Sequence, residues 1–92
     1  MPSTVRARAI FHGYVQGVGF RFTAKLLANS FAVTGWVRNL TDGTVELVVQ
    51  GSAAEVNAYL DQLRSEMKDH ISRAETDWIS RVEDEKGFVV RF

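Results

Sequence analysis

The chain consists of short stretches in which hydrophobic residues recur at every second position, interrupted by two stretches in which they recur at every third or fourth. A period of two is typical of a β-strand with one covered face, and a period near 3.6 is typical of an amphipathic helix. The alternating stretches predict strands at residues 5–11, 33–39, 44–50, 72–82 and 88–92. The helical stretches begin at residues 20 and 53, which predicts the order β-α-β-β-α-β followed by a terminal strand.

Both predicted helices have a hydrophobic stripe that would face a core. In the first, which we expect to make about three turns, the stripe consists of Phe20, Ala24, Leu27 and Phe31. Ser52 and Glu55 form a capping box before the second: the serine oxygen accepts from a free N–H group and the glutamate reaches back to the start of the helix. The stripe of the second helix consists of Val56, Leu60, Leu63 and Met67.

The connections restrict how these elements assemble. Thr41-Asp42-Gly43 is a hairpin turn signal, and each βαβ unit must cross over in the right-handed sense. Interleaving the two units predicts one antiparallel sheet, ordered four-one-three-two, with both helices on one face. This is a ferredoxin-like α+β sandwich, which we expect to form a single domain over residues 1–92. Because this fold hosts metal carriers, RNA binders, regulatory domains and enzymes, function has to be argued from particular residues.

Composition removes several classes of function. The 92 residues are 46% hydrophobic, which suffices for one small core. Eleven basic residues are balanced by eleven acidic ones, which argues against a broad nucleic-acid surface. Without cysteine there is no disulfide, thiolate nucleophile or cysteine metal site. The sequence shows neither a signal-like N-terminus nor an apolar run that could span a bilayer, so we expect a cytoplasmic protein without a membrane partner. We also expect a monomer.

The most informative segment is the glycine-rich stretch Gly13-Tyr14-Val15-Gln16-Gly17-Val18-Gly19-Phe20-Arg21. A loop that leads into a helix presents unpaired N–H groups and the positive end of the helix dipole to an anion. Arg21 adds a planar cation that matches a phosphate. The segment lacks the Gly-Lys-Ser/Thr of the Walker loop, and Phe22 stands where the dinucleotide fingerprint has glycine. Glycine-rich turns before helices also occur without any ligand.

A second candidate lies at the end of the second predicted strand. That strand runs parallel to the first, so Arg38 and Asn39 should lie at the same edge of the sheet as the glycine-rich segment. Asn39 could then approach an anion held by the loop and Arg21. An asparagine at a strand end commonly makes a local turn hydrogen bond. The functional alternative is that its amide holds a water molecule in line with a bound phosphorus atom.

Two motifs together resemble the acylphosphatase family over essentially the whole chain: Gly13-x-Val15-Gln16-Gly17-Val18-x-Phe20-Arg21 and Gly35-Trp36-Val37-Arg38-Asn39-x-x-Asp42-Gly43-x-Val45-Glu46. The resemblance implies hydrolysis of the carboxyl–phosphate bond of acyl phosphates such as acetyl phosphate, with no cofactor and no metal. It implies that Arg21 binds the phosphate, that Asn39 orients the attacking water, and that inorganic phosphate is both product and inhibitor. It also implies that the phosphate oxygens are bound by the loop residues Val15, Gln16, Gly17, Val18, Gly19 and Phe20.

The chemistry of such a substrate agrees with this set of residues. The leaving carboxylate has a conjugate acid with a pKa of about 4, so it departs as an anion without a proton donor. Phosphoryl transfer otherwise depends on positioning and on stabilisation of charge, which an arginine and backbone amides provide. Two alternatives remain open: a non-catalytic phosphate- or oxyanion-binding regulatory module, and the acylphosphatase-like domain of carbamoyl-phosphate-handling maturation proteins. His12 could be a phosphohistidine nucleophile, but its strand position favours a residue on the sheet face.

Overall fold

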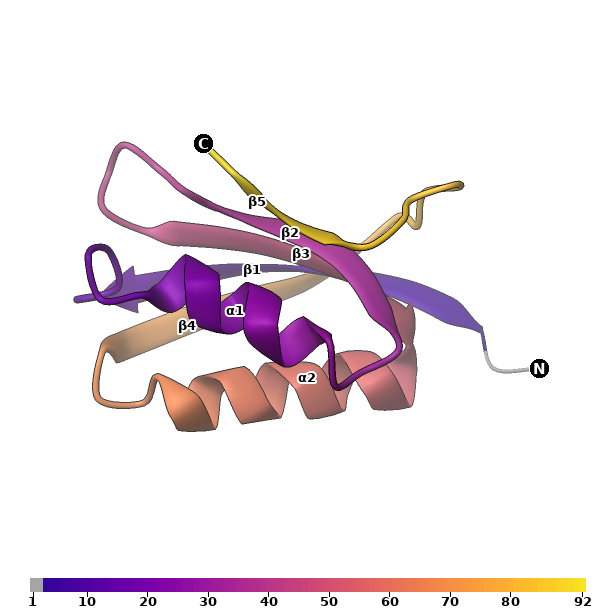
Figure 1. Cartoon of the computed structure of the whole chain (residues 1–92), viewed down its shortest axis with the longest axis horizontal. Coiled ribbons are helices and arrows are strands. Elements are labelled where there is room, and N and C mark those ends of the chain that lie inside the picture. The colour runs from indigo at the N-terminus through magenta and orange to yellow at the C-terminus, as the bar shows by residue number, and fades with distance from the viewer. Residues whose placement is uncertain (1–2) are drawn as a thin grey trace.

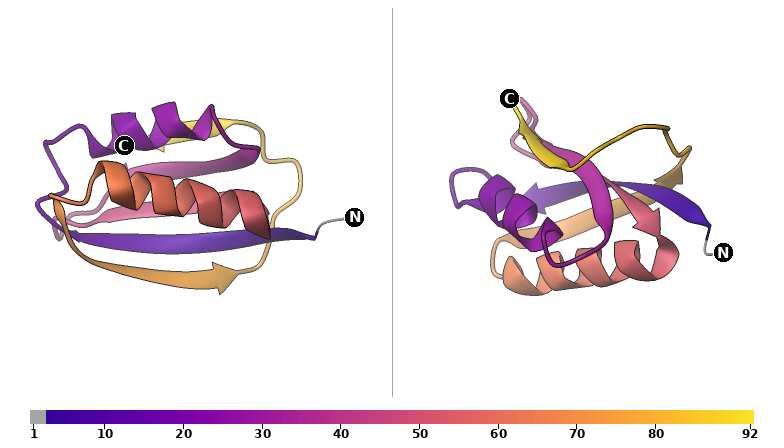
Figure 2. Two further views of the ribbon diagram at one scale, coloured as in Figure 1. Left: turned by 90° about the horizontal axis from the view of Figure 1, so that it is seen from below. Right: turned by 45° about the vertical axis from the view of Figure 1, so that its right-hand side comes forward.

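The computed structural model describes residues 3–92, in which a five-stranded sheet is covered on one face by two helices (Figure 1). The elements are β1 (Thr4–Gly13), α1 (Phe20–Ala28), β2 (Val33–Asn39), β3 (Val45–Ser52), α2 (Ala53–Glu66), β4 (Ile71–Ile79) and β5 (Phe88–Arg91). Figure 2 shows from two further directions that α1 and α2 lie on the same side of the sheet. The predicted domain span of residues 1–92 includes two residues, 1 and 2, that lie outside the described part.

The strand order is β4-β1-β3-β2-β5, which confirms the predicted ferredoxin-like arrangement of the first four strands. β1 pairs antiparallel with β3 and β4, and β2 pairs antiparallel with β3. β5, whose place the sequence pattern did not indicate, pairs with β2 in parallel, from Gly35 opposite Phe88 to Arg38 opposite Arg91. The complete sheet is therefore mixed, and the last strand lies beside the strand that ends at Asn39.

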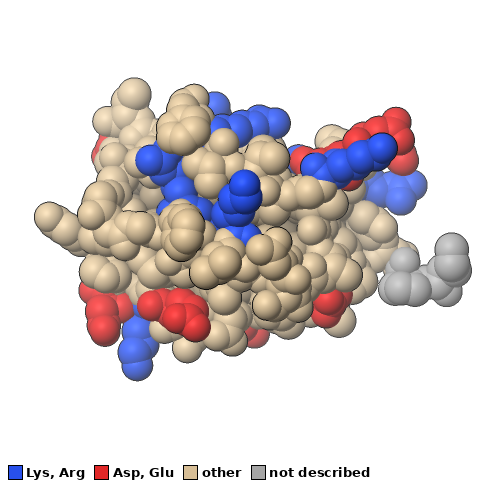
Figure 3. Space-filling model, viewed as in Figure 1, with Lys and Arg blue, Asp and Glu red and all other residues tan. Residues whose placement is uncertain are grey.

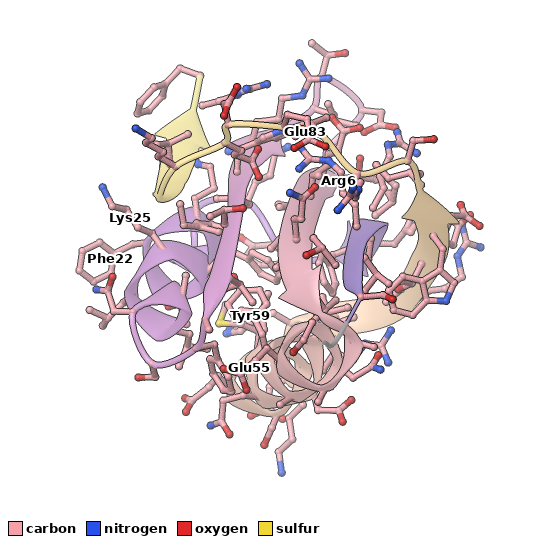
Figure 4. The ribbon with its side chains drawn as sticks, turned by 90° about the vertical axis from the view of Figure 1, so that its right-hand side faces the viewer. Arg6, Phe22, Lys25, Glu55, Tyr59 and Glu83 are labelled. Carbon is pink, nitrogen blue, oxygen red and sulfur yellow. The ribbon has the colours of Figure 1, made fainter. Side chains whose placement is uncertain are left out.

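The core lies between the sheet and the helices, as the hydrophobic pattern predicts. The alternating residues Ala7, Ala9 and Phe11 of β1 are completely buried. Tyr59 of α2 is also buried, and its hydroxyl group donates a 2.7 Å hydrogen bond to the carbonyl oxygen of Ala24 in α1. Burial raises the pKa of Tyr59, which therefore remains a donor. Figure 4 shows Tyr59 between α2 and the sheet, where it holds the two helices together.

The first helix is shorter than predicted, because α1 ends at Ala28 and Phe31 lies beyond it. The N–H groups of Asn29, Ser30 and Phe31 donate to carbonyls three residues earlier, at 3.2, 2.9 and 3.3 Å, which tightens the chain into a turn. Asparagine and serine compete with the helix for backbone hydrogen bonds and so favour its end. Phe31 nevertheless packs against the core, which is why its spacing resembled that of a longer helix.

The predicted capping box is half confirmed. Ser52 caps α2, and its hydroxyl oxygen accepts a 3.2 Å hydrogen bond from the N–H group of Glu55. The carboxylate of Glu55 accepts instead from the N–H group of Ala32 at 2.8 Å. The first turn of α2, where Figure 4 marks Glu55, is thereby attached to the start of β2 rather than closed on itself.

β4 ends at Ile79, earlier than predicted, because residues 80–87 leave the sheet edge and cross its outer face. The Arg6 guanidinium on that face donates to both carboxylate oxygens of Glu85, at 2.9 and 3.0 Å. The Arg6 side chain is only 7% exposed, and Figure 4 shows it beneath the crossing segment. This ion pair holds the segment that leads into β5 and so directs β5 to the free edge of β2.

A second ion-pair cluster on the outer face lies next to the end of β2. The Glu46 carboxylate, whose side chain is 6% exposed, accepts from the Nε atoms of Arg8 and Arg38, each at 2.6 Å. Burial by itself would raise the pKa of Glu46, but the hydrogen bonds from the two arginines outweigh it and hold that pKa below its usual value. Glu46 is therefore charged at neutral pH and orients Arg38, the neighbour of Asn39.

We expect Glu46→Gln to lower the free energy of unfolding by about 1–2 kcal/mol at pH 7. This is less than the usual contribution of hydrogen bonds to a charged group, because both arginines are half exposed. A lowered folded-state pKa means that this stabilisation is present above the unfolded value of 4.5 and disappears as the pH falls through the folded value. Urea unfolding at neutral pH and at about pH 3 measures both effects. A difference that is the same at both pH values would contradict this account, and the exposed Glu83→Gln serves as the control.

Candidate active site

A pocket of about 350 Å³ opens at one end of the sheet, where the glycine-rich loop, α1, β2 and β5 meet. Arg21 comes from the first turn of α1 and Asn39 from the last residue of β2, so the structure brings the two predicted site residues into one pocket. The lining consists of Val15, Gly17, Gly19, Phe20, Arg21, Phe22, Lys25, Asn39, Val90 and Phe92. Two of the predicted loop residues, Gln16 and Val18, are not part of this lining.

The loop's backbone conformation depends on two of its glycines. Gly17 and Gly19 have φ values of 77° and 78°, in the left-handed region that other residues rarely adopt. A Cβ atom at either position would meet no atom within 4 Å, so the constraint is conformational rather than steric. Gly19 is also the N-cap residue of α1 and has no side chain to cap the helix.

A second feature of the loop is that, in the described part of the chain, its N–H groups are not used by the backbone hydrogen bonds around the start of α1. The N–H groups of residues 15–19 donate none of the backbone hydrogen bonds found between the helices and strands of the described range 3–92. The first N–H groups of a helix also have no partner within it, and the positive end of the dipole lies there. The segment therefore has the features of an anion-binding helix N-terminus, with the Arg21 guanidinium beside it.

The loop is held from both sides by contacts that the sequence pattern did not indicate. At its start, the N–H group of Tyr14 donates a 2.9 Å hydrogen bond to the carbonyl oxygen of His70. In its middle, the Gln16 side-chain amide donates to the carbonyl oxygens of Leu40 and Thr44, at 2.7 and 2.9 Å. Val18 packs against the core. The Gln16 side chain thus ties the loop to the turn that follows Asn39.

That turn is the predicted hairpin, and its own residues supply its hydrogen bonds. The Asp42 carboxylate accepts from the N–H group of Thr44 at 3.0 Å and from its hydroxyl group at 2.6 Å. These two hydrogen bonds lower the pKa of Asp42. Among the described residues 3–92, the side-chain hydrogen bonds of this turn are made by Asp42, and Asn39 is one of the residues that line the pocket.

Arg21 is positioned mainly by the end of β5. Its guanidinium carbon lies 4.9 Å from the centre of the Phe92 ring, and its Nη1 atom is 3.5 Å from the carbonyl oxygen of Arg91, which is a long contact. No acidic residue is present in the pocket lining. The salt bridges of residues 3–92 likewise do not involve Arg21, so its charge is available to an anionic ligand.

The other candidates lie away from this pocket. His12 is on the outer face of the sheet, where its ring contacts the Glu75 carboxylate and the Arg73 guanidinium. It is therefore a sheet-face residue, as its strand position favoured. Across the described range 3–92, no three His, Cys, Asp or Glu side chains are grouped as metal ligands would be. In the same range no helix is long and apolar enough to cross a membrane.

Comparison with known proteins agrees with the fold. The family model described as Acylphosphatase matches residues 7–90. An acylphosphatase from Bordetella parapertussis is 56% identical over 55 residues, which covers 60% of this chain but only 58% of that protein. One from Anaeromyxobacter dehalogenans is 38% identical over the full length of both chains.

A solved structure supports the same relationship. The structure of an acylphosphatase from Coxiella burnetii superimposes with a TM-score of 0.81 at 31% identity, covering 96% of this chain and 93% of the other. The family match over residues 7–90 includes the glycine-rich loop, α1 and β2, and the full-length relative covers the whole chain. The chain therefore belongs to the acylphosphatase family.

Proposed function

We propose that this protein hydrolyses the carboxyl–phosphate bond of acyl phosphates to a carboxylate and inorganic phosphate, without a metal or cofactor. The observation that supports the proposal is that Arg21, Asn39 and residues of the glycine-rich loop line one pocket. Membership of the acylphosphatase family supports the same reaction class.

In this proposal the loop and Arg21 bind the transferred phosphoryl group. The backbone N–H groups of Val15, Gln16, Gly17, Val18, Gly19 and Phe20 surround its oxygens. The planar guanidinium of Arg21 adds two parallel donors, which a lysine could not supply in that geometry. Since the Gln16 side chain holds the loop against the hairpin, it fixes the distance between these donors and Asn39.

The reaction then requires only an oriented water molecule. The Asn39 amide holds the water in line with the phosphorus atom, and the bond from phosphorus to the acyl oxygen breaks with its electron pair on the carboxylate. A carboxylate needs no proton donor to leave, because its conjugate acid has a pKa of about 4. The guanidinium and the loop amides stabilise the charge on the phosphoryl oxygens in the transition state.

We further propose that the chain acts as a single domain over residues 1–92 and as a cytoplasmic monomer. Its partners would be a small acyl phosphate and inorganic phosphate, the latter as product and competitive inhibitor. The absence of an acidic residue in the pocket lining supports binding of an anionic product at the same place.

We expect the purified protein to release inorganic phosphate from acetyl phosphate in the presence of a chelator, with added inorganic phosphate competing. Glycerol phosphate, whose alkoxide leaving group needs an acid or a metal, should not be hydrolysed at a comparable rate. The measurement is phosphate release against substrate concentration. Binding of inorganic phosphate without turnover of acetyl phosphate would instead favour the non-catalytic oxyanion-binding module.

A further inference from the structure

The pocket contains a second cation for which the proposed hydrolysis has no use. Lys25 is part of the pocket lining and stands four residues after Arg21 on α1, so both lie on the same face of the helix. Like charges at this spacing destabilise a helix. The first turn of α1 contains no acidic residue, and the salt bridges of residues 3–92 do not involve Lys25. Within the described residues, neither positive charge therefore has a salt-bridge partner within 4.0 Å.

The surroundings of Lys25 are open and partly apolar. Figure 4 shows Lys25 and Phe22 projecting together from α1, with Lys25 on the side toward β5. Phe22 is 71% exposed, and Phe92 at the other side of the pocket is fully exposed. In Figure 3, basic side chains gather over α1 and the acidic ones lie toward the margins of the same face. A bound ligand that extends from the phosphate site toward Lys25 would pass the apolar surface of Phe22 and Phe92 before it reached the Lys25 ammonium group.

We infer that Lys25 binds a carboxylate at the far end of the acyl group, so that the preferred substrates are the monoacyl phosphates of short dicarboxylic acids. The inference rests on the proposed hydrolysis of acyl phosphates. Four residues of helix correspond to about 6 Å along the axis, which a short carbon chain spans. The methylene or vinylene groups of that chain would lie against Phe22 and Phe92.

A carboxylate fits this position better than a second phosphate. Lys25 supplies one ammonium group on a flexible stem, and the N–H groups around it are already bonded within α1. Phosphates are bound by free N–H groups at a helix N-terminus or by a guanidinium, and the pocket has these only at the loop and Arg21.

Fumaryl monophosphate and crotonyl phosphate test the inference. Both have the same trans carbon chain, which ends in a carboxylate in the first and in a methyl group in the second. The trans double bond also keeps the carboxylate from attacking its own acyl carbon. We expect Lys25→Gln to lower the ratio of kcat/KM for fumaryl over crotonyl phosphate by about three- to fivefold, the upper part of the range for one exposed ion pair. In the unmodified protein the ratio should also fall as salt is added.

Two further variants separate this effect from a general loss of charge. Lys86→Gln removes one positive charge from the segment between β4 and β5, away from the pocket, and should leave the ratio unchanged. Lys25→Arg keeps the charge and should keep the ratio. A Lys25→Gln variant that hydrolyses both substrates with the unmodified ratio would overturn the inference while the proposed function stands. If the unmodified protein hydrolyses neither substrate, the proposed function and the inference both fail.

Discussion

Replacing Arg21 by lysine should lower kcat/KM for acetyl phosphate by about 10³-fold, the lower end of the contribution of an arginine to phosphoryl transfer. Lysine keeps the positive charge, so this change isolates the geometry of the guanidinium. A single ammonium group cannot donate two parallel hydrogen bonds to one phosphoryl group, and it would also lose the planar contact with the Phe92 ring. Steady-state kinetics, together with the inhibition constant for inorganic phosphate, measures the loss.

The matched control is Arg81→Lys. Arg81 is exposed, contacts Glu83 at 3.6 Å and is not part of the pocket lining. Its replacement should change neither the kinetics nor the inhibition by phosphate. If Arg21→Lys kept most of the activity, positive charge alone would be sufficient. The proposed pair of parallel hydrogen bonds from the guanidinium to the phosphoryl group would then be wrong.

Asn39→Ala should lower kcat by about 10²-fold, comparable to the loss of one hydrogen-bonding group that acts on the reacting atoms. Its expected signature differs from that of Arg21→Lys because the amide contacts water rather than the phosphoryl group. KM and the inhibition constant for phosphate should therefore change little while kcat falls. The structure supports this separation, because Asn39 and Arg21 reach the pocket from different elements, β2 and α1.

Asn57→Ala, on the exposed side of α2, is the control for replacing an asparagine, and it should leave kcat unchanged. Urea unfolding of both variants would detect any effect on the hairpin. We expect none from Asn39→Ala, since the hydrogen bonds of the turn are made by Asp42 and Thr44. Full turnover by Asn39→Ala would show that the water is oriented by another group.

Taken together, the two variants would assign separate tasks to the two sides of the pocket. The loop and α1 would bind the phosphoryl group, and the end of β2 would place the water. The Gln16 side chain connects these two sides directly through the carbonyl oxygens of Leu40 and Thr44. We therefore expect no large conformational change when a ligand binds, because these hydrogen bonds already hold the two sides together.

The sequence by itself determined the element types and the order of the first four strands, and it predicted that Arg21 and Asn39 would lie close together. Alternation in Ala7, Ala9 and Phe11 indicates a strand because side chains on a strand alternate between faces. The right-handed crossover rule then made β2 parallel to β1. Asn39, at the end of β2, was therefore expected at the same end of the sheet as the glycine-rich loop, which follows β1. These conclusions depend on local periodicity and on chain connectivity, both of which can be read from a sequence.

Only the tertiary structure decided which groups meet across the fold. The Arg6–Glu85 ion pair brings residues 80–87 over the outer face and so puts β5 on the edge of β2. That placement in turn adds Phe92 to the pocket. The bridge from Gln16 to the hairpin and the second cation at Lys25 depend in the same way on packing between distant segments. Such contacts leave no periodic trace in the sequence, because each is a single pairing between residues far apart in the chain.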